Sequence, residues 1–426
     1  MLAAAGFAVC ALPAPLPTPV LAFAVRRLGA AAGVQITASH NPPADNGYKV
    51  YLADGAQLAP PVDGEIEAAI SAARPAVSVP LDSGVETLGD DVLEAYLDRV
   101  GALPRGTARA LRVALTPLHG VGGSPAVHAL HRAGFSDVHV VPAQAVPDPG
   151  FPTVAFPNPE EPGATDALLA LAAAVDADLA VALDPDADRC ALGVPLRGGG
   201  WRMLTGDETG VLLGDHLLRT GSYDDPLVAT SVVSSSMLRE VAATYAARYA
   251  ETLTGFKWIV RAGPGLVYGY EEALGYCVDP DAVRDKDGIA AAVLACDLAA
   301  GLRAAGATLL DRLDELAATH GVHRTEGLSV RLDGPARDEA VTRLAAAPPA
   351  GWTVERPAPD VVVLRREGER VVVRPSGTEP KLKAYLQVVE APTGDIAAAR
   401  ARADARLDAL RTELGAILTA RDDDPA

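Results

Sequence analysis

The alternation of apolar runs with polar turns predicts strands and helices that follow one another along most of the chain. Short apolar runs predict buried strands at 111–116, 179–183 and 227–233. Apolar residues at helical spacing predict helices near these strands, at 126–133, 164–174 and 236–247. A strand that leads through a turn into a helix is typical of doubly wound α/β sheets. We therefore expect α/β domains in the middle of the chain.

The two ends of the chain show different patterns. The beginning predicts strands at 6–11, 34–36 and 48–52 and helices at 20–28, 63–73 and 92–100. The end predicts strands at 327–332, 361–364, 370–373 and 383–389 and a closing helix at 396–418. Between them lie a predicted loop at 254–258, a strand at 267–270 and a helix at 289–304. These changes divide the chain into four expected domains: 1–104, 105–215, 216–320 and 321–426.

The first nineteen residues are apolar but do not form a secretory signal or a membrane span. No basic residue precedes the apolar stretch, and Pro13, Pro15, Pro17 and Pro19 interrupt it. A buried strand at 6–11 would also need neighbours in its sheet. We therefore expect the first domain to be incomplete, because either the true start lies upstream or the gene copy is degraded.

Composition and charge narrow the class of partner. The chain has 426 residues, 49% hydrophobic and 4% aromatic, and a formal net charge of −18. Negative charge and few aromatic rings argue against binding to nucleic acid or to anionic membranes. The four cysteines show no paired metal-ligand spacing: Cys10, Cys190, Cys277 and Cys296. Unpaired thiols of this kind indicate a reduced, cytoplasmic location.

The loop after the strand at 34–36 holds a serine with the neighbours of a reactive group. Ser39 is followed by His40, by Pro42 and Pro43, which end the strand, and by Lys49 ten residues further on. An exposed serine near a base and a cation can act as a nucleophile or carry a phosphate. The alternative is a surface turn whose serine makes only local hydrogen bonds.

Three aspartates alternate directly after the strand at 179–183: Asp184, Asp186 and Asp188, followed by Arg189. Carboxylates this close raise one another's pKa, and a divalent cation relieves the repulsion. Oxygen ligands favour Mg²⁺. An EF-hand is rejected because its sixth and twelfth positions would be Arg189 and Pro195. The remaining alternative is a solvated acidic turn.

Two later stretches have the chemistry of a phosphosugar site. Glu271 and Glu272 end the strand at 267–270 and suit sugar hydroxyls, although an acidic first turn of a helix is the alternative. Arg374, Ser376, Gly377, Thr378 and Lys381 predict a phosphate-binding loop. The glycine-rich turn at 117–124, which contains His119, could hold an anion or could only permit close packing.

Taken together, these motifs resemble those of the α-D-phosphohexomutase superfamily, the phosphoglucomutases and phosphomannomutases. The resemblance rests on residues 37–42, 184–189, 271–272 and 374–380 and covers essentially the whole chain. It implies three doubly wound α/β domains, the first incomplete here, and a smaller α+β C-terminal domain. It also implies a phosphosugar substrate, Mg²⁺, and glucose 1,6-bisphosphate as primer.

The resemblance implies a role for each motif. Ser39 would be the phosphoserine and would hold Mg²⁺ with Asp184, Asp186 and Asp188. Lys49 would be the general acid/base, His40 would steady the loop and Arg189 would neutralise charge. Lys286 is a second acid/base candidate. The expected substrate contacts are His119, Thr254, Gly255, Lys257, Glu271, Glu272, Arg374, Ser376, Gly377, Thr378 and Lys381.

The expected activity is the interconversion of glucose 1-phosphate and glucose 6-phosphate by a monomer or weak homodimer. The sugar loop at 270–276 and the stretch at 285–288 look like the longer branch with phosphoglucomutases and phosphopentomutases. Phosphopentomutase and phosphomannomutase activities therefore stay open, as does a non-catalytic, truncated protein that binds phosphosugars. A serine hydrolase is disfavoured because Ser39 lies in no Gly-x-Ser-x-Gly turn.

Overall fold

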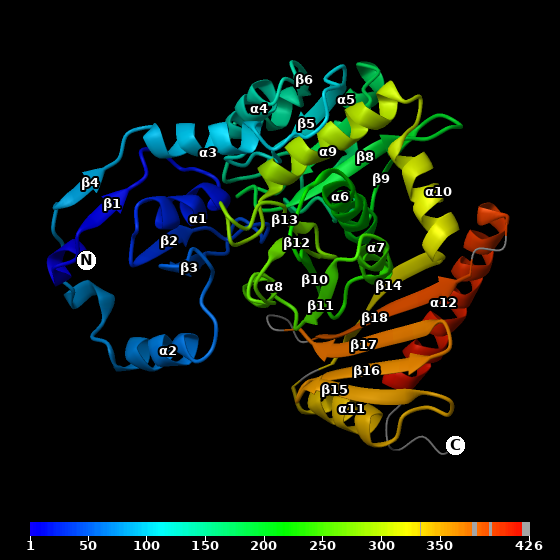
Figure 1. Ribbon diagram of the computed structural model, residues 1–426. Helices are drawn as coiled ribbons and strands as arrows, with labels where there is room; N and C mark the ends of the chain where they lie inside the picture. The colour runs from blue at the N-terminus through cyan, green and yellow to red at the C-terminus, as the bar shows by residue number, and fades with distance from the viewer. Residues whose placement is uncertain (333, 377–380, 392–393, 420–426) are drawn as a thin grey trace.

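Buried parallel strands form the centre of the second domain (Figure 1). The computed structural model describes residues 1–332, 334–376, 381–391 and 394–419. The sheet of this domain has the order β6-β5-β7-β8-β9, with β5 parallel to β6 and β7, and with β8 and β9 antiparallel. Its elements are β5 (Arg112–Thr116), α4 (Gly123–Arg132), β6 (Asp137–Val140), η3 (Pro142–Gln144), α5 (Asp166–Ala174), β7 (Leu179–Leu183), β8 (Cys190–Pro195) and β9 (Trp201–Met203). Every residue of β7 is buried. The acidic loop begins directly after its last residue, at Asp184.

The third domain repeats this plan with a smaller sheet. The strand order is β11-β10-β12-β13, in which β10 is parallel to β11 and β12. Its elements are α6 (Gly206–Thr220), β10 (Leu227–Ser231), α7 (Met237–Thr244), β11 (Arg248–Thr252), α8 (Phe256–Ile259), β12 (Leu266–Glu271), β13 (Gly275–Cys277), α9 (Gly288–Ala304) and α10 (Leu309–His320). The short helix α8 lies where the sequence predicted a loop at 254–258, and that part of the prediction is wrong.

The C-terminal domain is an antiparallel sheet with helices on one face. The strand order is β14-β18-β17-β16-β15. Its elements are β14 (Val322–Arg331), α11 (Gly334–Ala346), β15 (Thr353–Ala358), β16 (Val361–Arg366), β17 (Glu369–Pro375), β18 (Lys381–Glu390) and α12 (Ile396–Thr419). Val371 and Val373 share a core with both helices, whereas Val372 on the other face packs with Val232 and Val233 of the third domain.

The N-terminal domain forms a lobe on the left of Figure 1. It contains two separate strand pairs, β1 parallel to β4 and β2 antiparallel to β3. Its elements are η1 (Ala3–Ala5), β1 (Val9–Ala11), α1 (Thr18–Arg27), β2 (Ala32–Ile36), β3 (Tyr48–Leu52), α2 (Val62–Ala72), η2 (Ala76–Ser78), β4 (Val85–Thr87) and α3 (Asp91–Gly101). The predicted buried strand at 6–11 is shorter and has no buried residue, and α2 buries none of its side chains. Phe7, Ile36 and Tyr48 are instead exposed.

One continuous hydrophobic core joins the first three domains. Helices α1 and α3 of the N-terminal lobe contribute Val25, Leu97 and Val100 to it. Leu115 of β5 and Leu294 of α9 belong to the same cluster. Because apolar burial is the main stabilising contribution to a fold, this shared core holds the lobe against the central domains.

Helix α6 is continuous across residue 215, where the sequence pattern placed a domain boundary. A capping box fixes its start, since Thr205 Oγ1 accepts from the backbone of Glu208 and the Glu208 carboxylate accepts from the backbone of Thr205. Helix α10 begins in the same way at Thr308 and Asp311. Neither helix was predicted: α6 is buried on most sides and shows no single apolar face, whereas the apolar residues of α10 do follow helical spacing, at Leu309, Leu313 and Leu316.

Among the described residues, no single helix is long and apolar enough to cross a membrane. The pair α9 and α10 meets those criteria only together and is bent by 88° at the break between them. Most of α9 is buried in the shared core, which accounts for its apolar composition.

Candidate active site

The acidic loop is the centre of the site. Asp184, Asp186 and Asp188 leave the end of β7 with buried side chains, and their ligand oxygens lie within 4.8 Å of one another. Ala187 adopts a left-handed backbone with φ of 55°, which turns the chain sharply between the second and third aspartates. Burial, and then the charges of its two neighbours, raise the pKa of Asp184 well above its usual range. Three carboxylates this close repel one another, and a bound cation lowers that repulsion.

These three carboxylates fit a hard divalent cation. All of their donor atoms are oxygens, and they are gathered from one short loop. Asp188 Oδ1 accepts no hydrogen bond from the described part of the chain, although Arg189 Nε lies 3.8 Å away. An uncommitted, buried carboxylate oxygen is available for a metal ion.

Ser39 lies against this loop. Its Oγ is 2.9 Å from Asp184 Oδ2 and 3.1 Å from Asp186 Oδ1. The backbone at Ser39 is left-handed, with φ of 52°, and its N–H donates to Thr37 Oγ1 at 2.8 Å. The loop conformation thus directs the serine hydroxyl at the acidic loop, 145 residues away in the sequence.

His40 stands next to Ser39 as a neutral base. Its Nδ1 is 3.9 Å from Asp184 Oδ2 and forms no hydrogen bond with any described residue. Burial, and then the charge of Arg189, lower the pKa of His40 to about 4. The imidazole is therefore uncharged at neutral pH and can accept a hydrogen bond.

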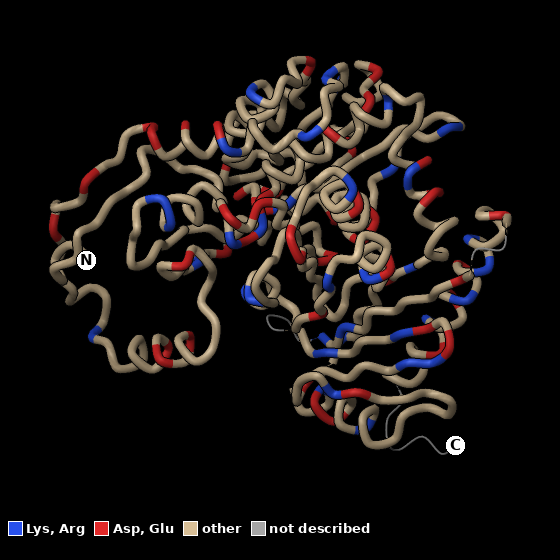
Figure 2. Tube along the Cα trace, viewed as in Figure 1, with Lys and Arg blue, Asp and Glu red and all other residues tan. Residues whose placement is uncertain are grey.

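Two lysines from different domains meet at Asp188. Lys49 of β3 pairs with Asp188 and with Asp186, the latter at 2.8 Å, and Lys286 Nζ is 3.3 Å from Asp188 Oδ2. Burial opposes the charge on both lysines, but Asp188 and the other nearby carboxylates together outweigh it and raise the pKa of each. Lys49, Lys286 and Arg189 together balance the three carboxylates. Figure 2 shows this gathering of acidic and basic residues where the N-terminal lobe meets the central domains.

The sugar-binding candidates lie next to this cluster. An isolated bridge between Arg189 and Gly275 joins the acidic loop to the start of β13. Glu271, at the end of β12, is buried. Glu272 accepts from the hydroxyls of Ser231 and Ser234, and burial followed by the charge of Glu271 raises its pKa to about 7. The two glutamates thus place two carboxylates side by side, where sugar hydroxyls could donate hydrogen bonds to them.

A cleft of about 610 Å³ runs from Glu272 to the C-terminal sheet. Glu160 of the second domain and Lys383 and Tyr385 of β18 also line it. Arg374, at the end of β17, donates to Tyr385 at 3.2 Å, and its guanidinium carbon is 5.7 Å from the centre of that ring. The phosphate-loop candidate Arg374 therefore lies next to the C-terminal side of this cleft, through its contact with Tyr385.

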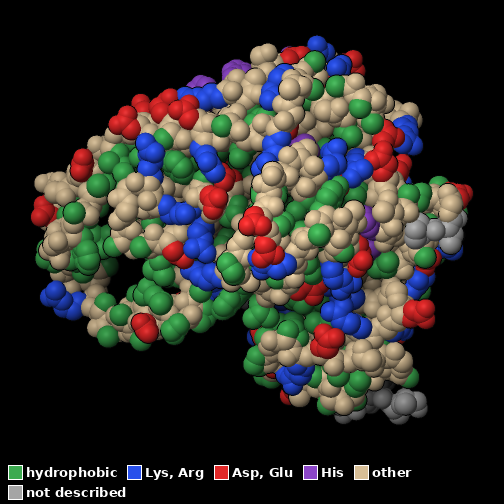
Figure 3. Space-filling model, viewed as in Figure 1, with side chains coloured by type: hydrophobic (Ala, Val, Ile, Leu, Met, Phe, Trp, Pro, Cys, Tyr) green, Lys and Arg blue, Asp and Glu red, His purple; other side chains and the backbone are tan. Residues whose placement is uncertain are grey.

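Of the remaining predicted residues, the structure describes Lys381, His119 and the three at α8. Gly377 and Thr378 lie outside the described residues, and Lys381 begins β18. His119 hydrogen-bonds to Thr153 Oγ1 at 2.8 Å and lines a separate cavity of about 480 Å³ together with Ser39. Thr254 and Gly255 precede α8, and Lys257 pairs with Asp63 at 3.6 Å. Figure 3 shows Lys and Arg side chains along the junction between the N-terminal lobe and the rest of this face.

Several residues at the site were missed by the sequence analysis. Thr18, Tyr51 and Gln57 of the first domain, and Lys383 of the last, have no motif that marks them. One signal could have indicated Lys383. The chain contains only five lysines, and the other four were all predicted as site residues. In a chain that otherwise uses arginine, each lysine is a candidate for a role that needs a primary amine.

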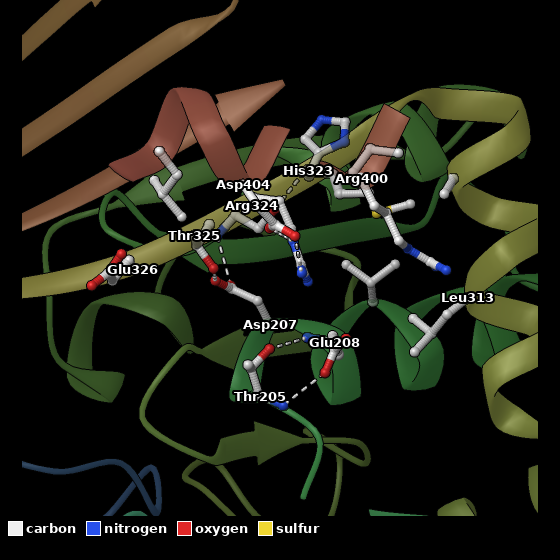
Figure 4. A pocket seen from close by; sticks show the side chains of 16 residues that line it. Thr205, Asp207, Glu208, Leu313, His323, Arg324, Thr325, Glu326, Arg400 and Asp404 are labelled. Atoms are coloured by element: carbon white, nitrogen blue, oxygen red, sulfur yellow. Dashed lines mark hydrogen bonds and ion pairs between the residues drawn. The ribbon is translucent and has the colours of Figure 1, made fainter. Parts of the chain in front are cut away.

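A further cavity of about 300 Å³ lies between α6, α10, β14 and α12 (Figure 4). None of the residues that line it was predicted as a site residue. Its charged side chains are paired, with Arg324 on Asp404 at 2.6 Å and Thr325 donating to Asp207 at 2.7 Å. The cavity is a junction of the third and C-terminal domains and is separate from the acidic loop.

Four family models of known proteins match nearly the whole chain. Models of the phosphoglucomutase/phosphomannomutase family match it in order: α/β/α domain I at residues 1–76, domain II at 94–197, domain III at 205–320 and the C-terminal domain at 328–406.

Individual relatives differ in the sugar that their names give. The chain is 42% identical to a protein named "Probable phosphomannomutase" from Haemophilus influenzae, over 91% of this chain and 83% of that protein. It is 33% identical to a "Probable phosphoribomutase" from Schizosaccharomyces pombe, over 87% and 72% of the two chains. A phosphoglucomutase/phosphomannomutase family protein from Burkholderia thailandensis has the same fold, with a TM-score of 0.73, 20% identity, and coverage of 98% and 85%.

Proposed function

The chain belongs to the phosphoglucomutase/phosphomannomutase family, a family of phosphomutases, and we propose that it interconverts glucose 1-phosphate and glucose 6-phosphate through a phosphoserine at Ser39. The observation that carries this proposal is the contact of Ser39 Oγ with Asp184 and Asp186, beside Lys49 and Lys286. A nucleophilic oxygen, an acidic metal-type loop and two amines are the groups that phosphoryl transfer needs.

In the first transfer, the bond between phosphorus and Ser39 Oγ breaks and a bond forms from phosphorus to a sugar hydroxyl oxygen. The proton of that hydroxyl leaves, and Ser39 Oγ regains a proton. We assign both proton movements to Lys49, which shares Asp186 with Ser39. Its ammonium gives a proton to Ser39 Oγ, and the amine that remains takes the proton of the sugar hydroxyl. The product is a sugar bisphosphate, which returns its other phosphoryl group to Ser39 by the reverse steps. A trace of glucose 1,6-bisphosphate would therefore prime unphosphorylated protein.

The groups around the acidic loop would neutralise the negative charge of the transferring phosphoryl group. Asp184, Asp186, Asp188 and an oxygen on Ser39 would hold Mg²⁺, which supplies positive charge to the transferring phosphoryl group. Arg189 is fixed beside Asp188 and Asp184, where its guanidinium adds to that charge. His40, uncharged, packs beside Asp184 and steadies the loop.

The sugar bisphosphate has to turn around between the two transfers. Glu271 and Glu272 accept hydrogen bonds from the sugar hydroxyls, and Arg374 and Ser376 bind the phosphate that is not reacting. The cleft of about 610 Å³ that Glu272 and Tyr385 line, with Arg374 in contact with Tyr385, is large enough for a hexose phosphate. Thr254, Gly255, Lys257, His119 and Lys381 are the remaining candidates for substrate contacts.

The test is a coupled assay with Mg²⁺, a trace of glucose 1,6-bisphosphate and, in parallel, glucose 1-phosphate, mannose 1-phosphate and ribose 1-phosphate. We expect turnover of glucose 1-phosphate that EDTA abolishes. Ser39→Ala should lose at least about a thousandfold in turnover, whereas Ser136→Ala, at an exposed serine, should keep it. Full turnover by Ser39→Ala would refute the phosphoserine mechanism. Faster turnover of mannose 1-phosphate or ribose 1-phosphate would show that this sugar phosphate, and not glucose 1-phosphate, is the preferred substrate.

A further inference from the structure

Two buried tyrosines of the N-terminal lobe contact the aspartates on either side of Lys286. Tyr51 of β3 donates from its hydroxyl to Asp285 Oδ2 at 2.6 Å, and Tyr96 of α3 donates to Asp287 Oδ1 at 2.8 Å. Both tyrosine side chains are fully buried. The segment 285–287 is thus held by the first domain although it belongs to the third.

The two aspartates accept hydrogen bonds from different parts of the chain. Asp287 is the N-cap of α9 and accepts from the backbone N–H of Ala290 at 2.9 Å. Asp285 instead faces Lys286, because its Oδ1 accepts from the Lys286 backbone N–H at 2.8 Å and lies 3.5 Å from Nζ. Tyr96 therefore stabilises a helix start, whereas Tyr51 acts on the carboxylate that faces the lysine.

A second donor completes the arrangement at Asp285. Gln57 Nε2 donates to Asp285 Oδ2 at 2.7 Å, on the same oxygen that Tyr51 contacts. One carboxylate oxygen is occupied by the first domain and the other faces Lys286. With both donors in place, the Asp285 carboxylate cannot rotate away from the lysine without losing two hydrogen bonds.

The Lys286 ammonium needs such support because a free lysine side chain has many rotamers. In the structure it lies between Asp285 and Asp188, with Nζ 5.3 Å from the centre of the Phe256 ring. A Cβ at Gly275 would lie 2.3 Å from Lys286 Cδ, so the lysine stem packs directly on the backbone there. Only the absence of a side chain at Gly275 leaves room for this path.

The same strand that presents Tyr51 also presents Lys49. Side chains two residues apart on a strand lie on the same face, and here Lys49 meets Asp186 and Asp188 while Tyr51 meets Asp285. Strand β3 therefore carries one amine of the site, Lys49, and reaches the other, Lys286, through the hydrogen bond from Tyr51 to Asp285.

We propose that Tyr51 and Gln57, acting through Asp285, are positioning residues that fix the Lys286 ammonium beside Asp188 for phosphoryl transfer. The proposal rests on the function proposed above. The side-chain hydrogen bonds of both residues go to Asp285 and not to the acidic loop, so their effect on the reaction passes through the lysine.

The kinetic test compares Tyr51→Phe with Tyr96→Phe. Each change removes one buried hydroxyl that donates to one aspartate and keeps the ring. We expect Tyr51→Phe to lower kcat about tenfold, the loss of one hydrogen bond to a charged group, with little change in the KM for the sugar phosphate. Tyr96→Phe should stay within about twofold of the wild type in kcat. Equal losses in the two variants, or an unchanged kcat in Tyr51→Phe, would overturn the proposal.

A double-mutant cycle tests whether the effect passes through Asp285. If it does, the Tyr51→Phe, Asp285→Asn double variant is no slower than Asp285→Asn alone. Additive losses would mean that Tyr51 acts by another route and would overturn the proposal.

A measurement without turnover separates this proposal from the proposed function. Because the chain has only five lysines, acetylation by an amine-selective reagent can be followed at each one by peptide mass spectrometry. We expect Lys286 to react several-fold faster in Tyr51→Phe than in the wild type and in Tyr96→Phe, with Lys257 as internal reference. An unchanged rate at Lys286 would overturn the positioning role. If the wild type turned over none of the sugar phosphates, the proposed function would fail while this comparison still reported on the lysine.

Discussion

The Thr18 hydroxyl donates a 2.6 Å hydrogen bond to Asp186 Oδ2, and the Thr18 backbone N–H donates to the Asp186 carbonyl at 2.9 Å. Thr18 is fully buried at the start of α1, and 168 residues separate it from Asp186. The first turn of a helix in the N-terminal lobe thus orients one of the proposed metal ligands.

Thr18→Val should therefore weaken the use of Mg²⁺. Valine has nearly the same shape but no hydroxyl, so one carboxylate oxygen of Asp186 loses a donor and its orientation. We expect the Mg²⁺ concentration for half-maximal turnover to rise about tenfold, the effect commonly seen when the residue behind a metal ligand is removed. Thr18→Ser, which keeps the hydroxyl, serves as control and should stay close to the wild type. Equal Mg²⁺ requirements in all three proteins would contradict the role of this contact.

The metal assignment predicts a thermal shift that does not depend on turnover. A ligand that binds only the folded state stabilises it by about 2.7 kcal/mol at one hundred times its Kd. Saturating Mg²⁺ should raise the Tm of EDTA-treated wild-type protein, and Asp184→Asn should lose this shift. Asp148→Asn removes a carboxylate near Ser39 but outside the acidic loop, and it should keep the shift. A full shift in Asp184→Asn would place the cation elsewhere.

Gly120 permits the close approach of the turn after β5 to the acidic loop. A Cβ at this position would lie 2.3 Å from both the Cα and the carbonyl oxygen of Pro185. Gly120→Ala should therefore displace the loop or destabilise the domain by about 1–3 kcal/mol, as overpacking does. Thermal unfolding and the Mg²⁺ titration measure the two effects. Gly198→Ala, where a Cβ meets nothing within 4 Å, is the matched control, and an equally small effect in both variants would contradict the prediction.

Stability at acid pH should depend on His323, which lines the cavity in Figure 4. Burial lowers its pKa from 6.5 to about 4, against the opposing effects of its hydrogen bond with the Gly321 carbonyl and of the charge of Glu240. As pH falls from 6.5 toward 4, the unfolded chain binds a proton that the folded chain excludes, so stability is lost over this range.

His323→Gln removes that titration, so its Tm should fall less between pH 7 and pH 5 than the Tm of the wild type. His128→Gln, at an exposed histidine, should follow the wild type. Parallel Tm profiles for the wild type and His323→Gln would contradict the prediction.

Local features of the sequence were enough for the acidic loop and its strand. The apolar run at 179–183 predicted β7 within its observed bounds, and the three aspartates follow it at once. Lys49 was placed correctly on the strand at 48–52 for the same reason, since alternation over five residues is a short-range signal.

Burial in the N-terminal lobe was harder to predict. The helix at 62–72 has apolar residues at helical spacing, yet none of them is buried. The strand at 9–11 is equally apolar in sequence and is only partly covered. Hydrophobic spacing indicates which face could be buried, but whether another element covers that face depends on the rest of the fold.

The sequence by itself determined many of the elements, the order of the four domains and the motif residues, because these depend on patterns of a few neighbouring positions. Only the tertiary structure decided that Ser39 meets Asp184, that Thr18 holds Asp186 and that Tyr51 reaches Asp285. These partners are more than a hundred residues apart, and the shared hydrophobic core brings their domains together. A hydrogen bond between such residues leaves no spacing in the sequence, since the packing of distant elements alone sets which side chains face each other.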